Sequence, residues 1–209
     1  MLTLAEAQEL IRKGIRAPAN EQVALDQAVA RVLASDVVAA NPYPEFNASS
    51  MDGYAVASAS VRAANVRLPV VGESRAGSRT SKLAPGTTMR IFTGAPMPEG
   101  ADAVVMQEDV VREGDYAMFG TKAERWKFVR GRGEDLEEGA VALAAGVRLG
   151  AAQIALCALL DRVWLPVTKR PHVAIIPTGS ELRAAGEAGV FGMTPEANGV
   201  AISSMCRGV

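Results

Sequence analysis

Hydrophobic residues near the N-terminus recur at helical spacing and predict a first helix. Thr3 and Glu6 form a capping-box pattern that places the N-cap at Thr3, and Gly14 favours an end of the helix there. The apolar face of this helix consists of Leu4, Ala7, Leu10 and Ile11. Such a face is normally buried, so we expect it to belong to a hydrophobic core.

A second helix is predicted after Asp26, whose side chain is suited to an N-cap. Its apolar face consists of Val29, Val32 and Leu33, and we expect this face to be buried as well. Residues 35–40 then favour a short strand.

From residue 54 onward the pattern changes to short apolar runs separated by glycine, proline and aspartate. The predicted strands cover residues 54–57, 67–71, 88–92, 103–106, 116–119 and 125–129. Short strands at this spacing are typical of a small β-rich unit.

Helical spacing returns at residues 151–160, and residues 163–167 favour a strand. Residues 172–176 form an unalternating apolar run, typical of a strand buried on both faces of a parallel sheet. The polar loop 178–181 follows it at the carboxyl end, where open α/β sheets bind ligands. A last helix is predicted to begin at Asn198 and continue to residue 207, so the chain would end within an α/β domain after one βα unit.

Composition narrows the classes of function. The 209 residues are 49% hydrophobic and 22% charged with a net charge of −1, which predicts no nucleic-acid partner because there is no basic excess. The longest apolar stretch, 154–160, is too short for a membrane span, and the N-terminus lacks a signal-peptide core, so we expect a cytoplasmic protein. With one histidine and two distant cysteines, a zinc or iron–sulfur site is excluded, whereas carboxylate-held Mg²⁺ is not.

Four loops contain residues suited to chemistry. Each holds polar side chains or glycine near a predicted strand end, and they cover residues 49–53, 93–100, 130–135 and 178–181. Their carboxylates are Asp52, Glu134, Asp135 and Glu181, which would hold Mg²⁺ if they converged and would otherwise be solvated charges. Asp52 followed by Gly53 is equally typical of a tight turn.

Two further features of these loops leave alternatives open. Gly94 would let backbone amides approach a ligand, or the loop would serve only as a rigid connection between strands. Arg130 and Arg132 match the geometry of a phosphate, or they balance Glu134 and Asp135 as surface pairs.

Taken together and in order, the four loops resemble the molybdopterin molybdenumtransferase family, which includes the C-terminal domain of gephyrin. The matching segments are SSMDGYAV at 49–56, TGAPMPEGADAVVMQE at 93–108, RGRGED at 130–135 and TGSEL at 178–182. The resemblance therefore extends over nearly the whole chain.

The resemblance implies an α+β multidomain fold. A dimerising arm of helices and strands would comprise residues 1–47 and 137–169, with a β-rich domain inserted at 48–136. Residues 170–209 would be the first βα unit of a truncated α/β domain similar to molybdopterin adenylyltransferases.

The resemblance also implies Mg²⁺-dependent insertion of molybdate into adenylyl-molybdopterin with release of AMP, by a homodimer supplied by a molybdopterin adenylyltransferase. It assigns catalytic roles to Asp52, Thr93, Asp135 and Glu181, and metal or molybdate handling to Asp52 and Glu181. It assigns substrate binding to Ser50, Gly94, Arg130, Thr178 and Gly179.

The chain departs from the family pattern in two ways. Asn47-Ala48 stands where the family often has Asp-Asn, and Thr194 and Ala197 replace a usual isoleucine and serine. The rest of the α/β domain and a final β-barrel are absent, so we expect this chain alone to be inactive. The alternative is a non-catalytic module that dimerises and binds a partner, as the related domain of gephyrin also does.

Overall fold

The computed structural model describes residues 2–15, 18–79 and 81–207. By its internal contacts the chain divides into two units, Gln22–Val167 and a second unit that joins Met1–Glu21 to Thr168–Val209. The domain limits that the family resemblance implies differ from these units and stay a prediction.

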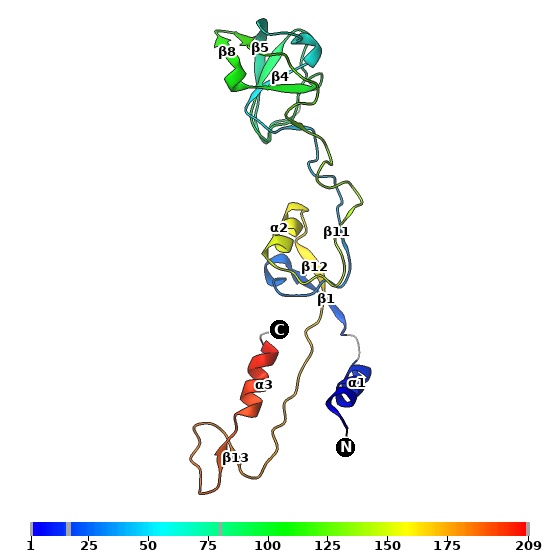
Figure 1. Ribbon diagram of the computed structural model, residues 1–209, viewed down its shortest axis with the longest axis vertical. Coiled ribbons are helices and arrows are strands. Elements are labelled where there is room, and N and C mark those ends of the chain that lie inside the picture. Colours follow the sequence, from blue (N-terminus) through cyan, green and yellow to red (C-terminus); the bar gives the residue numbers. More distant parts are fainter. Residues whose placement is uncertain (1, 16–17, 80, 208–209) are drawn as a thin grey trace. The chain divides into compact units, whose positions relative to one another are not determined.

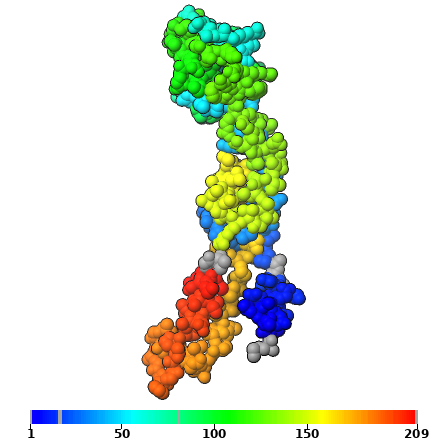
Figure 2. Space-filling model, viewed as in Figure 1, coloured from blue at the N-terminus to red at the C-terminus, as the bar shows by residue number. Residues whose placement is uncertain are grey.

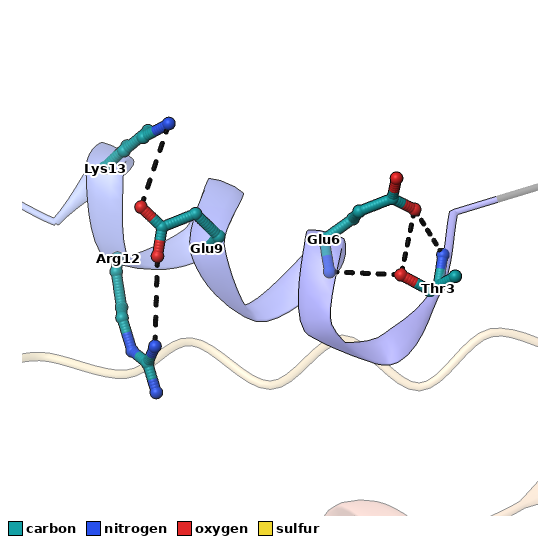
Figure 3. Close-up of polar contacts among 5 residues, drawn as sticks. All are labelled: Thr3, Glu6, Glu9, Arg12 and Lys13. Atoms are coloured by element: carbon teal, nitrogen blue, oxygen red, sulfur yellow. Dashed lines mark hydrogen bonds and ion pairs between the residues drawn. The ribbon is translucent and has the colours of Figure 1, made fainter.

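The first predicted helix is confirmed. α1 spans Leu4–Gly14 and begins with the expected capping box: Glu6 N–H donates to Thr3 Oγ1 at 3.3 Å, and Thr3 N–H donates to Glu6 Oε2 at 2.8 Å (Figure 3). On the same helix, Glu9 Oε2 lies 3.8 Å from Arg12 Nη1, and Glu9 Oε1 lies 3.7 Å from Lys13 Nζ. These contacts are all local, which is why the sequence alone was enough to locate the helix.

The expected burial of the apolar face of α1 is wrong for this structure. Leu4, Leu10 and Ile11 are 76%, 56% and 63% exposed, and α1 has no buried residue. Helical spacing identifies the face, but burial requires a surface to cover it.

The second predicted helix is wrong. Asp26 lies in a short 3₁₀ turn, η1 at Leu25–Gln27, and does not cap it. Ala30 follows with a φ of 62°, a left-handed conformation that a right-handed helix cannot contain. Of the proposed apolar face only Leu33 is buried, where it forms a bridge with Val167, and Val29 is 54% exposed.

One hydrophobic cluster joins segments from both ends of the Gln22–Val167 unit. Its elements are β1 (Asn20–Ala24) paired with β12 (Trp164–Thr168), β2 (Val37–Val38) paired with β11 (Val141–Leu143), and α2 (Ala151–Leu159). The predicted strand at 35–40 is thus confirmed in part, and the predictions at 151–160 and 163–167 are confirmed. Leu149, Leu165 and the thiol of Cys157 lie at the centre of this cluster.

The β-rich part is a curled six-stranded sheet in the order β7-β4-β6-β5-β9-β8, drawn from cyan to green in Figure 1. Its strands are β4 (Gly53–Val56), β5 (Val66–Ser74), β6 (Thr88–Ile91), β7 (Ala103–Met106), β8 (Val110–Glu113) and β9 (Tyr116–Phe119). Five of them were predicted, whereas β8 was not. It follows the short turn η3 (Gln107–Asp109) and pairs with β9.

Both faces of this sheet pack against hydrophobic side chains. Along β4, Tyr54 and Val56 belong to one cluster and Ala55 to another, as expected when successive side chains point to opposite faces. Residues of β7 alternate in the same way, with Val105 in the first cluster and Val104 in the second. The unalternating apolar runs of β4 and β7 are therefore explained by burial on both faces.

The predicted strand at 125–129 is wrong for most of its length. Only β10 (Val129–Arg130) forms there, paired with β3 (Ala48–Ser49). Trp126 and Phe128 have φ angles of 63° and 58°, so the backbone before β10 turns instead of extending.

The predicted buried strand at 172–176 is also wrong. These residues have no regular structure, and Val173 and Ile176 are 57% and 80% exposed. In the described part of the chain no strand pairs with them, and an apolar strand of this kind needs partners on both edges. Only two-residue strands form nearby, β13 (Leu182–Arg183) and β14 (Thr194–Pro195), which pair in parallel.

The last predicted helix is confirmed as α3 (Asn198–Arg207). Its first turn is bound by Glu196, whose carboxylate accepts the Gly199 N–H, rather than by Asn198. The segment after residue 170 and α3, orange and red in Figure 2, line a groove of about 630 Å³ that includes Val173, Ile175 and Cys206. Among the helices of the described ranges, none is long and apolar enough to cross a membrane.

Candidate functional site

The structure brings Asp52 and Thr93 together at one end of the sheet. Asp52 immediately precedes β4 and Thr93 follows β6, and these antiparallel strands pair with Gly53 opposite Ile91. Thr93 donates both its backbone N–H and its hydroxyl to Oδ1 of Asp52, each at 2.8 Å. Two residues that the sequence separates by 41 positions thus form one polar pair.

The surroundings of Asp52 favour its charged form. The backbone N–H of Thr93, then its hydroxyl, and finally the charge of Arg90 hold the pKa of the Asp52 carboxyl below its usual value. Both hydrogen bonds from Thr93 use Oδ1, and Oδ2 accepts none from the residues that the structure describes. Asp52 is therefore an ionised carboxylate with one oxygen available to a cation or substrate.

Gly53 does not lie in a tight turn, which was one of the interpretations of the Asp52-Gly53 pair. It is the first residue of β4, and a Cβ added there would lie 2.1 Å from the carbonyl oxygen of Val105 on β7. Glycine is required here because two backbones approach closely, not because φ is positive.

Backbone hydrogen bonds join the loops at 49–53 and 93–100, and they bind the first of these loops to Phe128, just before the loop at 130–135. Ser49 N–H donates to Ala95 O at 3.0 Å, Gly94 N–H to Ser49 O at 2.8 Å, and Ser50 N–H to Phe128 O at 3.0 Å. The amides of Ser50 and Gly94 are thus already paired within the protein. Gly94 adopts a φ of 77°, so its role here is to form the turn, not to present its N–H to a ligand.

The loop at 130–135 is held in place by its own side chains and by hydrogen bonds to residues 43–47. Arg130 forms an ion pair with Asp135, and Gly131 N–H donates to Glu134 Oε2 at 2.7 Å. The Asp135 carboxylate and above all its hydrogen bond raise the pKa of the Arg130 guanidinium. Arg130 and Arg132 were expected either to bind a phosphate or to form surface ion pairs, and Arg130 forms such a pair. Its guanidinium is only half-buried, so it remains accessible to an anion.

Arg132 has other partners than the acidic residues beside it. Its backbone N–H donates to Asn47 Oδ1 at 2.9 Å, its Nε donates to Glu45 O at 3.1 Å, and it lies 3.8 Å from Glu138. Asn47, one of the departures from the family pattern, thus binds the loop at 130–135 with its side chain. It also accepts Met97 N–H with its backbone carbonyl.

The fourth loop, with Thr178, Gly179 and Glu181, lies in the other unit. Its three predicted site residues are all exposed. The Glu181 carboxylate is turned back onto Gly179, where an added Cβ would meet Oε1 at 2.6 Å. This loop is described only by itself.

Sequence reasoning missed three residues beside the site. Arg90 and Gln107 contact the backbone next to Asp52, and Asn47 binds the neighbouring loop. A signal existed for Arg90, because it is a charged residue within the short apolar strand that ends just before Thr93.

The described donor set does not by itself meet the needs of a Mg²⁺ site. Among the described residues there is no group of three or more His, Cys, Asp or Glu side chains that could hold a metal ion. Mg²⁺ is often bound by one or two carboxylates together with substrate phosphates, and Oδ2 of Asp52 suits that arrangement. The described residues thus contain a carboxylate oxygen of a kind that Mg²⁺ can bind, but no complete metal cage.

The chain matches known proteins over most of its length. Residues 2–160 match the family model of the MoeA N-terminal region (domain I and II). The molybdopterin molybdenumtransferase of Synechococcus elongatus is 39% identical over 170 residues, which cover 78% of this chain and 42% of that protein. Molybdopterin molybdenumtransferase 2 of Mycobacterium tuberculosis is 36% identical over 99% of this chain and 52% of its own length.

Solved structures show the same fold. A crystal structure of the molybdopterin biosynthesis MoeA protein from Pyrococcus horikosii superimposes with a TM-score of 0.90 at 31% identity, covering 99% of this chain and 54% of that one. The chain thus spans about half the length of the relatives it matches. With a family model matched from residue 2 to residue 160, the chain belongs to the family of the MoeA N-terminal region.

Proposed function

We propose that the protein containing this chain inserts molybdate into adenylyl-molybdopterin and releases AMP. The proposal rests on one observation above all, the Asp52 carboxylate that is held by both donors of Thr93 and keeps one oxygen available. The relatives named molybdopterin molybdenumtransferase support it, since they share the segment in which this pair is built.

In this proposal each residue has a defined task. Thr93 orients the Asp52 carboxylate, which would be one ligand for Mg²⁺. When bound, Mg²⁺ would neutralise negative charge on phosphate oxygens of the substrate. Arg130 would bind substrate anions, with Asp135 fixing its guanidinium plane.

We assign residues 170–209 to the start of an α/β domain similar to molybdopterin adenylyltransferases, with Thr178, Gly179 and Glu181 on its ligand loop. The support is the TGSEL segment and the helix α3 that follows it. Glu181 would take part in metal or molybdate handling. The remaining half of the relatives' length would supply the rest of the substrate-binding surface.

We further propose a cytoplasmic homodimer that receives its adenylylated substrate from a molybdopterin adenylyltransferase. The exposed apolar side chains of α1 support an additional contact surface, because three large ones are more than half exposed. The same surface would serve the alternative function, a non-catalytic module that binds a partner. Sedimentation equilibrium of the full chain distinguishes a dimer from a monomer.

The assay uses the full-length product of the gene that encodes this chain. We expect Asp52→Asn and Thr93→Ala to slow molybdate-dependent AMP release at least about tenfold, a typical effect of disturbing a metal ligand or its support. Glu113→Gln is the control, since Glu113 is an exposed residue of β8 whose carboxylate forms an ion pair with Arg67 at 3.6 Å. Wild-type rates in both site variants would remove the proposed role of this pair.

A further inference from the structure

Arg90 is a charged residue in a strand that is otherwise buried. It lies on β6 between Met89 and Ile91, which are 6% and 0% exposed, and its own side chain is half-buried. The guanidinium carbon lies 5.3 Å from the ring centre of Tyr54 and 4.7 Å from that of Phe92. Contact with two aromatic rings fixes the position of this guanidinium on the sheet.

The Arg90 guanidinium binds Gly53 and Gln107, and both of these residues adjoin the backbone of Asp52. Nη1 of Arg90 donates to the carbonyl oxygen of Gly53 at 2.8 Å, and Nη2 donates to Oε1 of Gln107. Gln107 in turn donates its backbone N–H to the carbonyl oxygen of Asp52 at 3.1 Å. One side chain thereby contacts the residue that follows Asp52 and the residue that is hydrogen-bonded to it.

This arrangement requires a forked donor. A guanidinium presents several N–H groups in a fixed plane, so it reaches Gly53 and Gln107 at once, whereas a lysine ammonium is a single point donor on a flexible stem. Neither of the hydrogen-bond acceptors is a carboxylate, so the positive charge remains available to the nearby Asp52.

We propose that Arg90 is a positioning residue for the Asp52–Thr93 pair. By holding Gly53 and Gln107, it fixes the backbone from which the Asp52 carboxylate reaches Thr93. The catalytic meaning of this role rests on the proposed function, but the positioning itself does not. Arg90 acts through its neighbours and needs no contact with the substrate.

The first test reads the positioning without any enzymatic activity. Amide hydrogen exchange of Thr93 is measured by NMR in the full chain, because this N–H donates to Asp52. We expect Arg90→Met and Gln107→Ala to accelerate its exchange about tenfold, the effect of weakening one hydrogen bond, with Arg90→Lys in between. Arg67→Met is the matched control, since Arg67 on β5 of the same sheet also stacks on a ring, at 4.1 Å from Tyr116.

The outcomes are distinct. An unchanged exchange rate of the Thr93 amide in folded Arg90→Met overturns the proposal. An equally accelerated exchange of this amide in Arg67→Met also overturns it, because the effect would then be a general loosening of the sheet. If Arg90→Met does not fold, Gln107→Ala and Arg90→Lys decide by the same criterion.

The second test separates this proposal from the proposed function. In the full-length protein, Arg90→Met should lower kcat for molybdate-dependent AMP release about tenfold while KM for molybdate changes less, with partial recovery in Arg90→Lys. Faster Thr93 exchange with unchanged kcat would leave the positioning role standing and refute the catalytic role of the pair. A rise in KM alone, with normal Thr93 exchange, would overturn the positioning role.

Discussion

At the scale of single residues, two aspartates each accept the backbone N–H and the hydroxyl of one residue but have different roles. Asp52 accepts the N–H and hydroxyl of Thr93, and Asp102 accepts the N–H of Ser58 at 2.6 Å and its hydroxyl at 3.0 Å. Asp102 uses both carboxylate oxygens and also lies 3.4 Å from Arg125, so it ties the turn η2 (Ser58–Ser60) to the sheet. Only the tertiary contacts reveal that Asp52 keeps an oxygen available and Asp102 does not.

Gly53 gives a sharp prediction at this scale. Gly53→Ala should destabilise the protein by about 3 kcal/mol or more, because its Cβ would overlap a backbone carbonyl that cannot move without breaking the β4–β7 pairing. Chemical unfolding followed by circular dichroism measures the change. Gly72→Ala is the control, since a Cβ there meets only a methionine methyl at 3.6 Å. Equal stability of the two variants would show that the approach at Gly53 is not tight.

At the scale of elements, prediction succeeded where the determinants are local. α1 was located from its cap and its spacing, and α2 from its spacing alone. Five strands of the sheet were located from apolar runs between turn residues. The helix expected after Asp26 does not form, because the backbone of residues 28–33 is irregular and Ala30 has a left-handed conformation. The strand expected at 172–176 failed because a strand depends on partners that local sequence cannot supply.

The capping box of α1 predicts a pH dependence. Hydrogen bonds from the backbone and hydroxyl of Thr3 lower the pKa of the Glu6 carboxyl below its usual value. A lowered folded pKa means that the stabilisation is present above pH 4.5 and is lost as pH falls through the lowered pKa of the folded helix.

We therefore expect the exchange protection of the α1 amides, measured by NMR, to decrease in the wild type as the pH falls below 4.5. Glu6→Gln is the matched variant, because its amide oxygen can still accept the Thr3 N–H but does not titrate in this range. An identical pH dependence in both proteins would show that Glu6 is not the titrating group.

At the scale of the whole molecule, the Gln22–Val167 unit contains separate hydrophobic clusters. The cluster around Leu149, Cys157 and Leu165 shares no residue with the one around Tyr54 and Phe119. Segments far apart in sequence build the first, whereas residues 54–119 build the second. Such clusters are expected to open independently.

Phe119→Ala tests this independence. Phe119 is fully buried and contacts Tyr54 edge to face at 6.2 Å, so the substitution should cost about 3–5 kcal/mol within the sheet. Hydrogen exchange measured by mass spectrometry should show faster exchange in β4, β5 and β9 while α2 and β12 keep their protection. Leu165→Ala should give the reverse pattern. Uniform loss of protection in either variant would show a single cooperative core.

The sequence by itself determined the family, the helices α1, α2 and α3, most strands of the sheet and the four polar loops, because each depends on residues close together in the chain. Only the tertiary structure decided that Asp52 meets Thr93, that Gly53 is needed for a close approach to Val105, and that Arg90 lies beside the pair. It also decided which apolar faces are buried. Pairing and burial depend on contacts between distant segments, which neither spacing nor composition specifies.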